Sequence, residues 1–196
     1  KETIEGIQPW LDLVLDGLSP TLQQMTDTDP DSMFQGGQLA MYFSGNYMIP
    51  SYNKTLEGKY GIVKRPSFNG VDKDIINGLA FSVSANTKHP EEAKDFALWL
   101  GSKEAQEIQG KSGTVISARN DCQELFLDTH KDLNLQVFLD NVPNTELLPH
   151  CKVTAKLSQV EKTYLEQAWQ GEITLEEACK NIKPEADAIL DEMNAK

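Results

Sequence analysis

Hydrophobic residues recur at spacings of three and four along several parts of the chain, which places them on one face of an α-helix. This pattern predicts helices over 4–18, 90–101, 102–110, 158–171 and 174–193, with shorter ones at 31–36, 122–130 and 134–141. Ser158 and Thr174 each precede a glutamate by three residues, a capping-box spacing. Ser102 opens one helix, and Gly110 and Gly171 are the expected ends.

Other segments are typical of β-strands. "QLAMYFSG" (38–45) and "YGIVKRP" (60–66) are short apolar runs that end at glycine or proline. "LAFSVSAN" (79–86) alternates large and small residues with a period of two. "GTVISAR" (113–119) is expected to be a strand or an extended return. Strands mixed with helices predict an α/β fold in which helices pack on a sheet.

The charge of the chain excludes some partners. Its 196 residues carry a formal net charge of −12, so we expect no binding to nucleic acid or anionic lipid, whose phosphates would be repelled. There is no run of 18 apolar residues that could span a bilayer. The first residues, "KETIEGIQPW", match neither a signal peptide nor a lipidation motif. We therefore expect that a signal segment is not present in this chain.

The candidate metal and disulfide residues lack the usual spacings. Cys122, Cys151 and Cys179 form no CxxC motif, and a bridge between the first two stays open. "DTDPDS" (27–32) resembles the start of a calcium loop, but Ser32 and Gln38 stand where glycine and glutamate are needed. A capped turn before a helix fits this segment better. We expect no metal site and no cofactor.

The sequence also lacks a recognisable catalytic constellation. It contains neither a GxSxG elbow nor a phosphate-binding glycine loop, and we expect no catalytic residues. The stretch "FQGGQLAMYFSGNYMIPSYN" (34–53) does combine aromatics with glycines. Aromatic faces pack against the apolar face of a sugar, and a bare backbone at Gly45 would let a ligand approach closely. The competing interpretation is a core strand followed by a turn.

The same stretch resembles a family signature. Its residues fit F-x-x-G-x-x-A-M-x-x-x-G-x-W, namely Phe34, Gly37, Ala40, Met41, Gly45 and Tyr47. This resembles the extracellular solute-binding proteins of ABC importers, in particular the sugar-binding, maltose-binding-protein-like family. "YGIVKRPSFNG", "NGLAFSVSANTKHPEEAKDFALWLGSKEAQE" and "WQGEITLEEACKNI" are similar to later family segments in the same order.

The resemblance implies a periplasmic-binding-protein-like fold of two α/β lobes with a sugar in the cleft between them. It implies that this chain is mostly the C-terminal lobe (1–77 and 120–196) with a crossover segment, 78–119, of the N-terminal lobe. Tyr47 would be the aromatic platform, in place of the usual tryptophan, with Asn46, Asn77 and Gly78 as further ligand contacts. The partners would be a sugar or oligosaccharide and the permease subunits, outside the cytoplasm.

Two other functions stay open at this point. One is a carbohydrate-active enzyme or an auxiliary carbohydrate-binding domain. The other keeps the fold but binds a polyamine or another cation, which the negative charge would attract. We also expect that the apolar faces of 79–85 and 90–101 need a cover, and that this piece self-associates through a second copy.

Overall fold

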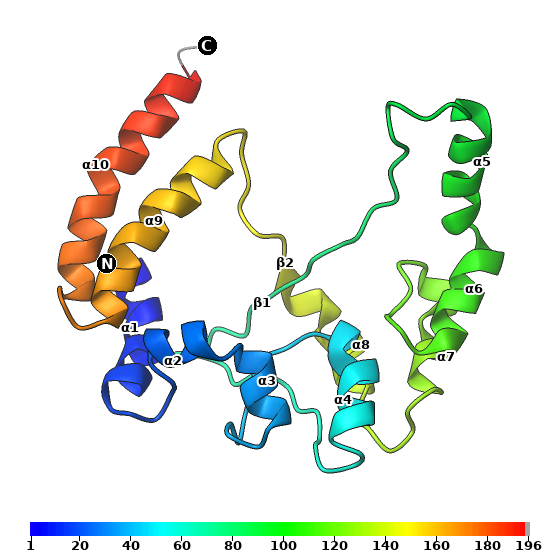
Figure 1. The fold of residues 1–196 in the computed structure, drawn as a ribbon, viewed down its shortest axis with the longest axis horizontal. Helices are drawn as coiled ribbons and strands as arrows, with labels where there is room; N and C mark the ends of the chain where they lie inside the picture. Colours follow the sequence, from blue (N-terminus) through cyan, green and yellow to red (C-terminus); the bar gives the residue numbers. More distant parts are fainter. Residues whose placement is uncertain (195–196) are drawn as a thin grey trace. The chain divides into compact units, whose positions relative to one another are not determined.

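The fold is described from a computed structural model, which covers residues 1–194. The chain divides into two compact units. The first combines residues 1–39 with the segment from Pro149 to the end of the described chain, and the second is 40–148. Most of the ordered structure is helical (Figure 1), and each unit has its own core.

The first unit is built from helices alone in the part that is described. Its elements are α1 (Glu2–Leu15), α2 (Leu22–Asp27), α3 (Pro30–Gln35), α9 (Thr154–Trp169) and α10 (Leu175–Asn194). The long helices α9 and α10 lie side by side, and both contact α1 (Figure 1). Their apolar faces meet in a core formed by Leu11, Ala168, Leu175 and Ala178. The helical periodicity of these segments is thereby explained by one shared core.

The helix boundaries of this unit test the sequence signals. The Thr174–Glu177 capping box is confirmed: the Glu177 backbone N–H donates to Thr174 Oγ1, and the Thr174 N–H donates to Glu177 Oε2 at 2.9 Å. Gly171 follows α9 with a φ of +75°, as a helix-ending glycine does. The predicted cap at Ser158 is wrong, because α9 already begins at Thr154 and Ser158 lies inside it.

The second unit contains shorter elements around a separate core. These are η1 (Asn46–Met48), α4 (Ile49–Thr55), β1 (Asp74–Ile75), α5 (Pro90–Leu100), α6 (Lys103–Ser112), η2 (Asn120–Cys122), α7 (Glu124–Leu127), α8 (Gln136–Asn141), η3 (Val142–Asn144) and β2 (Thr145–Glu146). The buried side chains Ile49, Phe126, Leu133 and Leu135 form the core. The sheet consists of β1 and β2, which pair in parallel with Asp74 opposite Thr145.

The predicted strands at 38–45, 60–66 and 79–86 are wrong for this chain, since none of these segments forms a strand. The segment 113–119, expected to be a strand or an extended return, forms no strand either. The stretch 38–45 is also not a buried core element: Met41 is 87% exposed. The physical reason is that a strand needs a neighbour for its backbone hydrogen bonds. Within the described residues the ladder between β1 and β2 spans two residues on each side.

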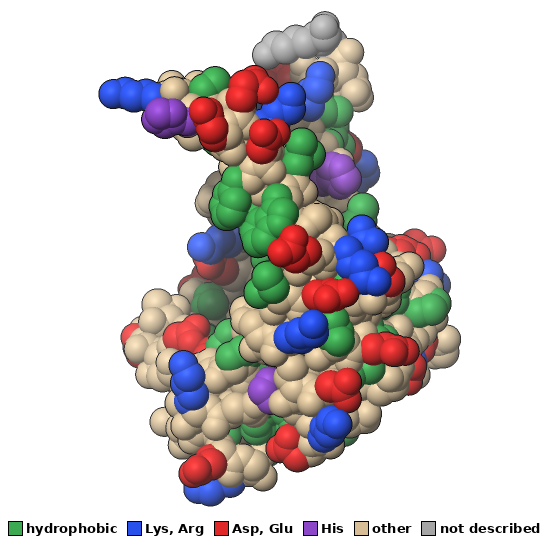
Figure 2. Space-filling view, turned by 90° about the vertical axis from the view of Figure 1, so that its right-hand side faces the viewer, with side chains coloured by type: hydrophobic (Ala, Val, Ile, Leu, Met, Phe, Trp, Pro, Cys, Tyr) green, Lys and Arg blue, Asp and Glu red, His purple; other side chains and the backbone are tan. Residues whose placement is uncertain are grey.

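Helices α5 and α6 lie close to their predicted positions. Ser102 opens α6 by accepting a hydrogen bond from the Ala105 N–H. The expected end at Gly110 is wrong, because α6 continues to Ser112 and ends at Gly113, whose φ is +68°. Hydrophobic side chains of α5 stay at the surface, with Phe96 59% exposed. Figure 2, which views the side of α5 and α6, shows hydrophobic side chains among charged ones of both signs.

Three further observations concern the cysteines, the turn at 27–32 and membrane spans. Cys122, Cys151 and Cys179 are all free thiols. Cys122 is fully buried. The turn at 27–32 is a helix cap: Asp29 Oδ2 accepts the Ser32 N–H at the start of α3. Among residues 1–194, no helix is both long and apolar enough to cross a membrane.

Candidate functional site

The proposed platform residue, Tyr47, lies on the single-turn helix η1. Its side chain is 64% exposed, so the ring offers much of its surface to solvent. Gly45 precedes η1 in an extended conformation, and its carbonyl accepts the Met48 N–H at 3.1 Å. This short turn projects the aromatic side chain from the surface of the second unit.

Two buried residues that follow η1 hold it in place. Ile49, directly after η1, is 2% exposed and belongs to the core with Phe126. Tyr52, one turn further on, is 5% exposed, and its hydroxyl donates to Ser44 Oγ at 3.2 Å. The residue before Gly45 and the residue after Met48 are therefore both anchored. An exposed ring on an anchored turn is suited to binding because little order has to be gained with the ligand.

Asn46 connects η1 to a distant segment. Its Oδ1 accepts the backbone N–H of Ile116 at 3.5 Å. This contact engages the carbonyl oxygen of the amide, while the amide nitrogen takes no part in it. The hydrogen bond from Ile116 uses the side-chain oxygen of Asn46. The side-chain nitrogen is therefore the group with which Asn46 would contact a ligand.

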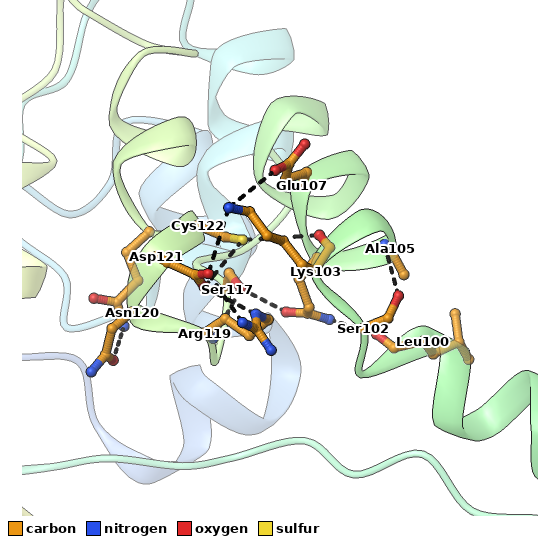
Figure 3. A network of polar contacts seen from close by, with 12 residues as sticks. Leu100, Ser102, Lys103, Ala105, Glu107, Ser117, Arg119, Asn120, Asp121 and Cys122 are labelled. Carbon is orange, nitrogen blue, oxygen red and sulfur yellow. Dashed lines mark hydrogen bonds and ion pairs between the residues drawn. The ribbon is translucent and has the colours of Figure 1, made fainter.

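The segment that carries Ile116 is itself fixed to α6 by buried polar groups. Ser117 is 1% exposed, and its hydroxyl donates to Gln106 Oε1 at 2.7 Å. Gln106, 5% exposed, donates in turn to the Leu100 carbonyl at 2.9 Å. The Arg119 N–H closes the turn by donating to Ser117 Oγ (Figure 3). Because buried polar groups are costly when unpaired, this network holds 116–119 firmly.

An ion-pair cluster borders the same network at the surface. The Arg119 guanidinium donates to both carboxylate oxygens of Asp121, at 2.9 and 3.0 Å, and Lys103 lies 3.8 Å from Asp121 (Figure 3). The hydrogen bond from Arg119 lowers the pKa of Asp121 below its usual value. The cluster is exposed to solvent, so it contributes little to stability. It connects α6 to η2 at the surface.

A chain of polar side chains lies beside α4. The Tyr60 hydroxyl donates to Asn53 Oδ1 at 2.6 Å, and Asn53 Nδ2 lies 2.9 Å from His130 Nδ1. Partial burial, followed by the charge of Asp132, raises the pKa of Tyr60. The neutral tyrosine is thus the form that joins this chain, which connects α4 to the end of α7.

The second predicted pair, Asn77 and Gly78, lies on an exposed connection after β1. The backbone just before the pair is held, because the Ile76 N–H donates to the Glu146 carbonyl at 3.1 Å. A side chain at Gly78 would meet no atom within 4 Å. The backbone is therefore held directly before Asn77. The role of Asn77 and Gly78 in ligand binding stays a prediction.

Sequence reasoning missed the residues that support η1. Tyr52, Ser44 and Ile116 act through tertiary contacts, and Ile116 is 70 positions from Asn46. The aromatic Tyr52 was visible in the stretch 34–53, but nothing in its spacing showed that its hydroxyl turns back to Ser44.

Groups of three or more metal-ligating side chains are absent from the described residues.

Comparisons with known proteins agree with this architecture. A family model described as "Bacterial extracellular solute-binding protein" matches residues 2–134, more than half of the chain. Among solved structures, the chain is similar to the ABC substrate-binding protein Lmo0181 from Listeria monocytogenes in complex with cycloalternan, at 20% identity and a TM-score of 0.71.

That similarity covers 98% of this chain but 50% of the Listeria protein, so the chain spans half the length of the structure it matches. At this level of identity the likeness shows the fold, and the α/β substrate-binding-protein fold expected from the sequence is confirmed. The family match over residues 2–134 covers the helix α1, the η1 turn and the network around α6. The chain belongs to the bacterial extracellular solute-binding protein family.

Proposed function

We propose that this protein binds a sugar or an oligosaccharide in a cleft between two lobes and delivers it to the permease of an ABC importer. The observation that carries the proposal is the Tyr47 ring, 64% exposed on an anchored turn. An exposed aromatic face packs well against the apolar face of a sugar ring. The similar Listeria protein was solved with an oligosaccharide, cycloalternan, which supports a carbohydrate as the ligand class.

Within this proposal, Tyr47 is the stacking platform and the amide of Asn46 binds a hydroxyl group. Asn77 and Gly78 contact the ligand from the crossover segment. Residues 1–77 and 120–196 belong to the C-terminal lobe, and 78–119 completes the N-terminal lobe. Lobe closure around the sugar then retains it until the permease is reached. The protein acts in the periplasm or anchored to the outer face of the membrane, without a catalytic step.

The lobe assignment also accounts for exposed apolar side chains in the crossover segment. Leu79 is 93% exposed and Phe81 55% exposed, and an apolar surface of this kind usually has a cover. In the proposed fold, the sheet of the N-terminal lobe covers it. Self-association of the 196-residue piece is the alternative, and light scattering of that piece would show whether it is monomeric.

A cationic ligand is the second candidate, because the net charge of −12 would attract a polyamine. Thermal-shift screening of the full-length protein against cycloalternan, maltotriose and spermidine separates the two classes. A ligand at 100 times its dissociation constant adds about 2.7 kcal/mol to the free energy of unfolding. Stabilisation by spermidine alone would contradict the sugar proposal. A carbohydrate-active enzyme would convert the oligosaccharide, whereas a binding protein returns it intact.

The residue-level test is Tyr47→Ala in the full-length protein. Loss of the aromatic face is expected to weaken sugar binding by about 1–3 kcal/mol, the scale of a lost aromatic anchor. Isothermal titration calorimetry measures this change directly. Phe68→Ala removes a partly exposed aromatic from the Phe68–Val71 turn, which carries none of the predicted site residues, and is the matched control. Unchanged affinity in Tyr47→Ala, with the sugar still bound, would show that the platform lies elsewhere.

A further inference from the structure

We infer that Gly45 is a positioning residue for the ligand platform: the missing side chain leaves the space that the Tyr47 ring occupies. The inference rests on the proposed function, because it assumes that Tyr47 contacts the ligand. It changes the role expected from the sequence, in which the bare backbone at Gly45 admits the ligand itself.

The geometry around Gly45 carries the inference. A Cβ atom built on Gly45 would lie 2.7 Å from Cδ1 of Tyr47 and closer still to Cε1. Cβ atoms in proteins essentially never approach other heavy atoms to less than 3.0 Å. The ring of Tyr47 therefore lies directly over the Gly45 Cα, where any other residue would have its side chain.

The backbone conformation does not explain why position 45 is a glycine. Gly45 has a φ of −114° and a ψ of 168°, an extended conformation that every residue adopts. Other glycines of the chain, such as Gly58 with a φ of +77°, do need their conformational freedom. At Gly45 the requirement is for space, and the atoms that use this space belong to Tyr47.

A methyl group at Gly45 would act on the ring and not on the fold. The atoms that it meets belong to an exposed side chain, which moves by rotating about its own torsions. Apart from Gly45 and its two chain neighbours, the three heavy atoms nearest to such a methyl group all belong to the Tyr47 ring. Gly45→Ala is therefore expected to leave the protein folded and stable while turning the platform away from its orientation.

The chain offers a matched control. A Cβ on Gly61 would meet nothing within 4 Å, and Gly61 is not among the residues with positive φ. Gly61→Ala thus adds the same methyl group within the same unit without touching an aromatic ring. The melting temperatures of Gly45→Ala and Gly61→Ala should both stay within about 2 °C of the wild type.

The ring position can be tested without a ligand, by NMR of the full-length protein with labelled glycine and tyrosine. Nuclear Overhauser contacts between the Gly45 Hα protons and the Tyr47 ring protons are expected, together with a ring-current shift of the Gly45 resonances. Tyr47→Leu should remove both signals. The absence of these contacts in the folded wild-type protein would overturn the inference, whatever the protein binds.

The binding test uses calorimetry with cycloalternan and maltotriose. Gly45→Ala is expected to weaken the binding of whichever sugar the wild type binds by roughly 5- to 150-fold, the range for a lost aromatic anchor. Gly61→Ala should bind like the wild type. In a Tyr47→Ala background, Gly45→Ala should cause no further loss, because the methyl group then has no ring to displace.

The two tests separate the possible failures. If Tyr47→Ala weakens binding but Gly45→Ala does not, the positioning role is wrong and the proposed function stands. If Gly45→Ala adds its full loss in the Tyr47→Ala background, Gly45 acts on the ligand directly and the inference is overturned. If the wild type binds neither sugar, these two are excluded as its ligands, and the NMR contacts alone decide whether Gly45 holds the ring.

Discussion

The end of helix α6 allows the most direct test of how the second unit is held together. Gly113 has a φ of +68°, in the left-handed region, and its N–H donates to the Gly110 carbonyl at 3.2 Å. A Cβ at this position would lie 3.0 Å from Thr129 Oγ1 and 3.0 Å from His130 Nε2. Gly113→Ala therefore combines an unfavourable backbone conformation with crowding against the residues that follow α7.

Two contributions set the expected magnitude. An L-residue in the left-handed region costs about 1–2 kcal/mol. Crowding in a packed site costs about 1–3 kcal/mol more, since the neighbours must shift by a few tenths of an ångström. His130 is not free to move without consequence, because its Nδ1 lies 2.9 Å from Asn53 Nδ2. We expect Gly113→Ala to lower the free energy of unfolding by about 2–5 kcal/mol.

The control is Gly58→Ala in the same unit. Gly58 also has a positive φ, +77°, but a Cβ there would meet no atom within 4 Å. Gly58→Ala should lower the free energy of unfolding by about 1–2 kcal/mol, the backbone contribution alone. Urea unfolding of the full-length protein, followed by far-ultraviolet circular dichroism, measures both variants, and an unchanged slope keeps the comparison valid.

The difference between the two variants isolates the contact with Thr129 and His130. Equal losses in Gly113→Ala and Gly58→Ala would refute the reasoning that α6 packs tightly against the end of α7. If Gly113→Ala is as stable as the wild type, the left-handed conformation at the end of α6 would also be wrong.

Two further predictions concern the same unit. Phe126→Ala should lower the free energy of unfolding, measured with urea, by about 3–5 kcal/mol, because the side chain is fully buried in the core with Ile49. A decrease below about 1 kcal/mol would contradict this core. The raised pKa of Tyr60 predicts an alkaline loss of stability, because the unfolded tyrosine ionises near pH 10 while the folded one stays protonated. The stabilisation is complete below about pH 10 and is lost as pH rises through the folded pKa. Urea midpoints at pH 9 and pH 11 should differ less in Tyr60→Phe than in the wild type.

Local signals in the sequence were sufficient for some of the helices, whereas α2 and α4 were not predicted. The capping box of Thr174 and Glu177 and the helical spacing of 174–193 correctly predicted α10, and the start of α6 at Ser102 was also correct. These features depend on hydrogen bonds and side-chain faces within one turn of the helix. The family resemblance was readable for a similar reason, since its motifs occur in order along the chain.

Features that depend on distant partners could not be derived in this way. The segments 38–45, 60–66, 79–86 and 113–119 have strand-like patterns, but a pattern does not supply the neighbouring backbone that a ladder requires. The sequence also placed the end of α6 at Gly110. That glycine is buried, and a Cβ there would lie 3.1 Å from the Cys122 carbonyl oxygen, so close packing explains it.

The candidate site shows the same division. Its aromatic and its glycine were visible in the order Gly45, Asn46, Tyr47. Only the tertiary structure showed that the ring lies over Gly45 and that the Asn46 amide accepts the Ile116 N–H from 70 positions away. Residue types and spacing specify which chemical groups a segment carries, whereas their orientation is set by contacts with parts of the chain that spacing does not relate to them.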